Sequence, residues 1–230
     1  MLRQLLAAWR GRNTLAMMVD QFDQMLAHDQ WMFEQATATY WRESPWPEVQ
    51  EPLYARDRQV NDIERSIRRE VVRHMTIHPG EDVVACLVLM SVVKDAERIG
   101  DYCKNIFEVG KIFRDAYTSE QYVAPLRELH QGVLALFGTT RHAFRKSDSE
   151  AARSVLEMFG GLGKRCDRMV EELLRRKDDM STDEAVSYGL LCRHMKRIGA
   201  HLSNIAGSVV TPVENLDFVE RPPAPPGNAS

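Results

Sequence analysis

Neither sign of charge is in large excess in this sequence, and no long apolar run is present. The chain has 30 Lys and Arg residues against 33 Asp and Glu residues, for a formal net charge of −3. This balance gives no reason to expect a nucleic-acid partner, because such partners usually select a basic surface. No segment reaches the roughly 18 apolar residues of a membrane-spanning helix. The first residues, MLRQLLAAWRGRN, carry charge too early for a signal peptide. We therefore expect a soluble, cytoplasmic protein.

Catalytic motifs are missing as well. The segment GGLG at residues 160–163 lacks the Lys-Ser/Thr pair of a phosphate-binding loop, and no nucleophile stands beside a base. The cysteines form no C-x-x-C pair, and each lies within an apolar helical pattern: Cys86, Cys103, Cys166 and Cys192. We predict that the chain is not an enzyme. We also predict that its cysteines are buried free thiols in a reducing compartment.

The alternation typical of strands is absent too, and the periodicity is helical instead. Apolar residues at steps of three and four form one seam: Leu89, Val92, Ala96, Ile99, Cys103, Ile106, Gly110 and Phe113. A second seam has the same spacing: Tyr188, Leu191, Met195, Ile198, Leu202, Ile205 and Val209. Such seams are typical of helices that bury one face. We therefore predict an all-α protein.

Prolines, glycines and capping residues divide the chain into six predicted helices. With their caps, they cover approximately residues 15–42, 49–75, 82–117, 118–146, 147–177 and 181–212. Thr118 or Ser119 is the predicted N-cap of the fourth helix, and the segment SDSE caps the fifth. Ser181 and Glu184 have the spacing of a capping box at the start of the sixth. The proline-rich tail is predicted to be extended or disordered.

Two segments far apart in the chain, here called the first and the second phrase, share one sequence motif. KDAERIGDYCKNI runs from Lys94 to Ile106, and HMKRIGAHLSNI runs from His194 to Ile205. Arg-Ile-Gly and Asn-Ile recur after 99 residues, in the third and in the sixth predicted helix. This spacing indicates an internal repeat, and hence two tandem three-helix bundles. The predicted divisions are residues 1–117 for the first repeat, 118–212 for the second and 213–230 for the tail.

The first phrase carries two acids that the second does not keep. Glu97 and Asp101 are four residues apart, so they share one helix face. Asp57 and Asn61 have the same spacing on the preceding helix, and antiparallel packing would bring the two pairs together. Carboxylate and amide oxygens are ligands for hard cations, and iron and manganese also accept carboxylate clusters. The alternative is that the acids pair with nearby basic residues: Arg58, Arg65, Lys94, Arg98 and Lys104.

The second repeat lacks the acidic side chains that could bind a cation in the first. Lys196 and Ala200 stand at the positions of the two acids, and Glu157 and Gly161 stand near those of the middle-helix pair. A cation site beside a lysine is disfavoured by like-charge repulsion. We therefore predict that metal binding is confined to the first repeat, whereas Arg-Ile-Gly and Asn-Ile are kept in both repeats for packing.

Two further groups of residues have packing as their simpler interpretation. His194 and His201 lie seven residues apart on one helix face, where they are either ordinary residues of an amphipathic helix or part of a separate site with a third ligand. An aromatic group surrounds the first helix and its exit: Trp31, Phe33, Tyr40, Trp41 and Trp46. For this group, packing in the core or between helices is favoured over a binding surface.

The segments DRQVNDIERSIRRE and VVKDAERIGDYCKNI resemble the PhoU family, the phosphate-uptake regulators. The family's repeat is a three-helix bundle with a D-x-x-x-N type pattern in its middle helix and E-R-I-G-D, then N-I, in its third. The resemblance spans about residues 15–212, with a degenerate second repeat. It implies a metal site built on Glu97 and Asp101, with Asp57 and Asn61 as helpers, and iron, manganese or zinc as the ion.

The resemblance also implies a function. It is that of a cytoplasmic regulator that modulates phosphate transport and phosphate-starvation signalling through protein–protein contacts. The implied partners are a phosphate transporter ATPase, a sensor kinase or another transporter, together with a second copy of the chain in a homodimer. The alternative from a different class is a metal-dependent phosphoester hydrolase or a metal-storage bundle, with Asp57, Glu97 and Asp101 as ligands and a metal-bound water as the nucleophile.

Overall fold

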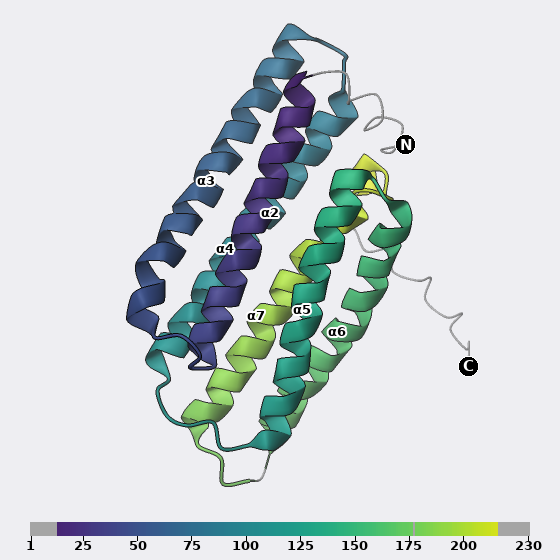
Figure 1. Ribbon diagram of the computed structural model, residues 1–230. Coiled ribbons are helices and arrows are strands. Elements are labelled where there is room, and N and C mark those ends of the chain that lie inside the picture. The colour runs from purple at the N-terminus through teal and green to yellow at the C-terminus, as the bar shows by residue number, and fades with distance from the viewer. Residues whose placement is uncertain (1–12, 177, 216–230) are drawn as a thin grey trace, which may run out of the picture.

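The computed structural model describes residues 13–176 and 178–215, and most of this part of the chain is helical (Figure 1). Six α-helices follow one another: α2 (Asn13–Tyr40), α3 (Trp46–Ile77), α4 (Val83–Ile112), α5 (Glu120–Lys146), α6 (Ser149–Arg175) and α7 (Thr182–Gly207). A short 3-10 helix, η1 (Val213–Asn215), follows them. The described residues contain no strand, and the prediction of an all-α protein is confirmed.

The helices form two bundles that lie side by side (Figure 1). The first consists of α2, α3 and α4, and the second of α5, α6 and α7. The main contact between them is α4 against α7, and α2 also touches α5. Buried apolar side chains of both bundles belong to one continuous core. The prediction of two tandem three-helix bundles is therefore confirmed. The junction between the bundles is formed by α4 and α7, the two helices that contain the repeated Arg-Ile-Gly motif.

The helix starts follow the predicted capping residues in part. Asp148 caps α6, because its carboxylate accepts hydrogen bonds from the backbone N–H groups of Glu150 and Ala151. Ser181 caps α7 by accepting from the N–H of Glu184 at 3.1 Å. Ser119 holds the N-cap position of α5 but makes no side-chain cap bond. The carboxylate of Glu184 does not complete a capping box; it reaches the segment between the bundles instead.

The segment of residues 113–119 corrects the prediction that the third helix continues to Tyr117. Phe113 is extended, with φ −75° and ψ 116°, and ends α4. Hydrogen bonds between side chains and backbone carbonyls join this segment to the end of α2. Arg42 donates two hydrogen bonds of 2.8 Å to carbonyls of this segment, and the hydroxyl of Tyr117 donates to the carbonyl of Tyr40 at 2.6 Å. Partners far away in sequence therefore set where α4 ends.

Several smaller predictions can also be compared with the structure. All four cysteines are free and buried, as predicted. From the aromatic group, Phe33, Tyr40 and Trp41 are buried in the core, in agreement with packing. The sixth helix ends at residue 207 rather than near 212. The predicted tail begins with η1, whose Val213 packs against the core, and residues 216–230 lie outside the described part. Within the described residues, no helix has the length and apolar character to cross a membrane.

Candidate metal site

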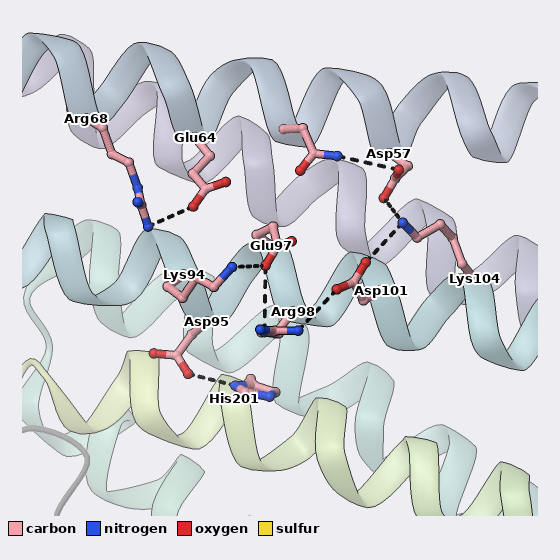
Figure 2. A network of polar contacts seen from close by, with 11 residues as sticks. Asp57, Glu64, Arg68, Lys94, Asp95, Glu97, Arg98, Asp101, Lys104 and His201 are labelled. Atoms are coloured by element: carbon pink, nitrogen blue, oxygen red, sulfur yellow. Dashed lines mark hydrogen bonds and ion pairs between the residues drawn. The ribbon is translucent and has the colours of Figure 1, made fainter.

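The four predicted metal ligands lie where α3 packs against α4, and Figure 2 shows the polar network around them. Asp57 and Asn61 are one turn apart on α3, with the Asn61 amide nitrogen 3.5 Å from an oxygen of Asp57. Glu97 and Asp101 are one turn apart on α4, as their spacing predicts. The helix packing places the first pair beside the second, which is the juxtaposition that the sequence suggested.

Lys104 joins the two helices at this point. Its ammonium nitrogen lies 2.9 Å from an oxygen of Asp57 and 3.0 Å from an oxygen of Asp101 (Figure 2). Burial alone would lower the pKa of Lys104, but its hydrogen bonds with these two carboxylates outweigh burial and raise the pKa. The lysine therefore supplies a permanent positive charge between two of the predicted ligands.

The remaining acids are paired as well. Glu97 accepts from Lys94 at 2.7 Å, and Arg98 lies 3.8 Å from Glu97 and 3.6 Å from Asp101. Ion pairing with local basic residues was the alternative interpretation of these acids, and it describes their contacts in the structure. Within residues 13–176 and 178–215, no three His, Cys, Asp or Glu side chains already stand in a metal-holding arrangement.

One carboxylate in this region was missed by the sequence analysis. Asp29 on α2 is 0% exposed, and neither of its carboxylate oxygens has a hydrogen-bond partner. Burial, together with the nearby charges of Asp57 and Glu97, raises the pKa of Asp29 well above its usual range. A buried carboxylate without a partner is costly, and here it faces two further acids.

A signal in the sequence could have revealed Asp29. It lies four residues after Met25 and four before Phe33, and both of these side chains are fully buried. The aspartate therefore occupies the apolar seam of its helix rather than the solvent face. A charged residue on a seam is rare in an ordinary core, so its position marks a candidate functional residue.

Gly100 leaves the space that these acids surround. A Cβ atom at this position would lie 3.3 Å from an oxygen of Asp29 and 3.6 Å from an oxygen of Asp57. The Arg-Ile-Gly segment was predicted to serve packing, and here its glycine allows two carboxylates to approach the α4 backbone. Unpartnered carboxylate oxygens and adjacent acids are features that suit a hard cation. The ammonium of Lys104 stands between Asp57 and Asp101, so an ion could use both carboxylates only after the lysine moved away.

The corresponding glycine of the second repeat, Gly199, is surrounded by apolar side chains. A Cβ atom on Gly199 would lie 3.0 Å from the ring of Phe159 and 3.4 Å from Leu136. The ammonium of Lys196 pairs with Asp167 at 2.5 Å. An aromatic ring therefore takes the place that carboxylates hold in the first repeat. Neither Glu157 nor Gly161, the positions suggested by sequence offset, is among the atoms nearest to Gly199.

The two histidines of the second phrase meet α4 at the junction of the bundles. His201 Nδ1 lies 2.7 Å from an oxygen of Asp95, and Asn204 donates to the same oxygen at 3.1 Å. The ring of Tyr102 contacts both histidines, with ring centroids 5.9 Å from His194 and 5.7 Å from His201. Both histidines therefore pack against side chains of the first repeat, in agreement with the simpler interpretation.

Comparison with known proteins places both halves of the chain in one family model. Residues 22–109 and 126–209 each match the PhoU domain. The chain is 26% identical over 157 residues to a phosphate-specific transport system accessory protein PhoU homolog of Xylella fastidiosa strain Temecula1, an alignment that covers 67% of this chain. It covers 65% of the Xylella protein, slightly less than two thirds of its length. The homolog of the same name from Synechocystis is 24% identical over 163 residues, which are 66% of this chain and 69% of that protein.

Two solved structures of PhoU proteins have a similar fold. The phosphate transport system regulatory protein PhoU from Streptococcus pneumoniae aligns with a TM-score of 0.73 and 18% identity, and the alignment covers 91% of this chain and 100% of that one. PhoU from Pseudomonas aeruginosa aligns with a TM-score of 0.66 and 20% identity, over 91% of this chain and 97% of that one. At these identities, the structural likeness shows the shared fold.

Proposed function

Because the chain belongs to the PhoU family, whose domain model matches both of its halves, we propose that it regulates phosphate transport and phosphate-starvation signalling. It acts in the cytoplasm by contacting other proteins, not by catalysis. Its partners are the ATPase of a phosphate transporter, a sensor kinase or another transporter, and it associates with a second copy of itself. The match of the PhoU domain in both repeats carries this proposal, and the names of the relatives support it.

Reporter expression in the organism that encodes the chain tests the regulatory role. Deletion of its gene is expected to raise expression from a phosphate-starvation promoter in phosphate-rich medium, and reintroduction of the wild-type gene is expected to restore repression. The purified chain is expected to bind the isolated transporter ATPase or the kinase domain saturably. An unchanged reporter, together with no binding to either partner, would contradict the proposal. Turnover of phosphoesters with added manganese or iron would favour the hydrolase alternative.

The second part of the proposal is a metal site in the first repeat, formed by Glu97, Asp101, Asp57 and Asn61. Iron, manganese or zinc at this place would neutralise the repulsion between the acids and hold α3 against α4. The acidic side chains supply oxygen ligands from both helices, and Asn61 supplies an amide oxygen. The role proposed for the site is structural, because it shapes the surface that α3 and α4 present to a partner.

We expect replacement of both α4 acids, Glu97→Gln with Asp101→Asn, to abolish tight metal binding. The change keeps side-chain size and removes two negative charges, so the fold is expected to survive. Elemental analysis after incubation with each metal and gel filtration measures the outcome. Asp62→Asn is the matched control, because Asp62 is an exposed α3 acid that pairs with Arg65; it should keep the wild-type metal content. Equal metal in the double variant and the wild type would reject these ligands.

A further inference from the structure

Two buried cysteines face each other where α6 packs against α7. Cys166 of α6 is 1% exposed, and Cys192 of α7 is 0% exposed. The Cys192 thiol donates a hydrogen bond to the carbonyl oxygen of Cys166, with 3.3 Å between sulfur and oxygen, and it is also within hydrogen-bonding reach of the Cys166 sulfur. A disulfide needs two sulfurs brought together from neighbouring backbones, and the contact between these two helices provides that arrangement.

The surroundings of the pair favour a thiolate on Cys166. The hydrogen bond from Cys192 lowers the pKa of Cys166 and outweighs the opposing effect of burial, and the ammonium of Lys196 lowers this pKa further. The same hydrogen bond raises the pKa of Cys192, which therefore keeps its proton. Because the thiolate is the nucleophilic form of cysteine, Cys166 is the more reactive member of the pair.

The two cysteines of the first repeat provide a contrast. Burial and the charge of Asp82 raise the pKa of Cys86 to about 11, and burial raises the pKa of Cys103 well above its usual range. Both lie on α4, and a separation of 17 residues places them about 25 Å apart along the helix axis. They cannot form a disulfide with each other, so they serve as internal controls for the pair in the second repeat.

A weak part of α6 provides access to the pair. Gly160 and Gly161 lie within two turns of Cys166, and nothing lies within 4 Å of a Cβ atom at either glycine. No close contact requires these glycines, and each weakens the helix compared with alanine. Local opening becomes more frequent as the stability of a segment falls. The ion pair between Lys196 and Asp167 is the cross-helix contact beside the cysteines, and an opening that breaks it would expose the Cys166 sulfur to solutes.

We propose that Cys166 and Cys192 form a peroxide-sensitive thiol pair that closes to a disulfide between α6 and α7. The Cys166 thiolate attacks one oxygen of hydrogen peroxide, the O–O bond breaks, and the leaving hydroxide takes up a proton to become water. The Cys192 sulfur then attacks the Cys166 sulfenic acid, and a second water leaves with the thiol proton. Two thiols are oxidised to one disulfide while one peroxide is reduced to two waters. In a reducing compartment such a disulfide is transient. The chemistry is independent of the cation site and of the regulatory role proposed above.

Treatment of the full chain with hydrogen peroxide tests this pair. The remaining thiols are alkylated in denaturant, and the chain is digested without reduction. Mass spectrometry is expected to find the peptides of Cys166 and Cys192 linked, and Cys86 and Cys103 alkylated. Cys166→Ser should slow peroxide consumption at least about tenfold, whereas Cys192→Ser should leave a sulfenic acid on Cys166 that dimedone traps. The matched control, Cys86→Ser with Cys103→Ser, should form the disulfide at the wild-type rate.

Thermal unfolding measures how well the bond fits the folded chain. The disulfide joins residues 26 positions apart, so the oxidised chain is expected to melt at least about 5 °C above the reduced chain, and dithiothreitol should reverse the shift. Gly160→Ala with Gly161→Ala should slow disulfide formation by strengthening α6; an unchanged rate would overturn the access route. Absence of the Cys166–Cys192 linkage, equal oxidation of all four cysteines, or an oxidised chain that melts no higher than the reduced one would overturn the proposal.

Discussion

Replacement of Gly110 by alanine is expected to lower the free energy of unfolding by about 3 kcal/mol or more. The new Cβ atom would lie 2.7 Å from the Cα atom and 2.8 Å from the nitrogen of Tyr40, and 3.1 Å from the carbonyl carbon of Thr39. These are backbone atoms, so no side-chain rotation relieves the contact. The end of α2 must move away from α4, and the ring of Tyr40 moves with it. Urea unfolding followed by circular dichroism measures the loss.

The matched control is Gly138→Ala on α5. Nothing lies within 4 Å of a Cβ atom at this exposed helical position, so the substitution should stabilise the chain by about 0.5–1 kcal/mol through helix propensity. The two alanine variants are therefore expected to shift the unfolding midpoint in opposite directions. Equal midpoints would show that the α2–α4 contact is looser than the distances at Gly110 indicate.

Replacement of Glu184 by alanine is expected to cost about 4 kcal/mol, because several buried donors would lose their acceptor. Its carboxylate accepts from the N–H and the hydroxyl of Thr118 at 2.6 and 2.7 Å, from the N–H of Ser119 at 3.3 Å and from the hydroxyl of Tyr188 at 2.6 Å. The glutamate is 2% exposed and fastens the segment between the bundles to α7. Glu184→Gln keeps the shape and one acceptor oxygen, which can receive three of the four hydrogen bonds, so its expected loss is smaller, about 1–2 kcal/mol.

The charge of Glu184 also predicts a dependence on pH. Burial opposes ionisation, but hydrogen bonds from Tyr188 and Thr118 outweigh it and lower the pKa of Glu184. A carboxylate with a lower pKa in the folded state adds stability above its unfolded pKa, about 4.3, and this contribution disappears as pH falls through the folded value. The stability difference between the wild type and Glu184→Gln should therefore shrink on the acid side. A difference that stays constant from neutral pH to pH 3 would contradict this assignment.

Much of the fold was predictable, because the helices depend on local patterns. Apolar seams such as the one from Leu89 to Phe113 predict long helices that bury one face, and the repeated Arg-Ile-Gly frame predicts two similar bundles. The end of α4 was not predictable in the same way. No proline or glycine precedes Tyr117 in this segment, and the helix stops where Arg42, some 70 residues earlier in the chain, binds the linker carbonyls.

The candidate site was predictable only in its outer part. Glu97 and Asp101 follow from a helical spacing, and Asp57 and Asn61 follow from the same spacing on a neighbouring helix. The contact of Lys104 with acids of two helices depends on the relative rotation of α3 and α4, which spacing alone does not define. Asp29 escaped notice because many helical acids are solvated, and only its place on the apolar seam of α2 distinguishes it.

Anomalous diffraction from a crystal soaked in Mn²⁺ tests the central claim, an asymmetric cation site in the first repeat, most directly. We expect one manganese peak per chain, between α3 and α4, with oxygens of Asp57, Glu97 and Asp101 within about 2.5 Å and with the ammonium of Lys104 displaced toward solvent. No peak, with Lys104 still between Asp57 and Asp101, would contradict the account, and so would a peak beside Lys196 in the second repeat.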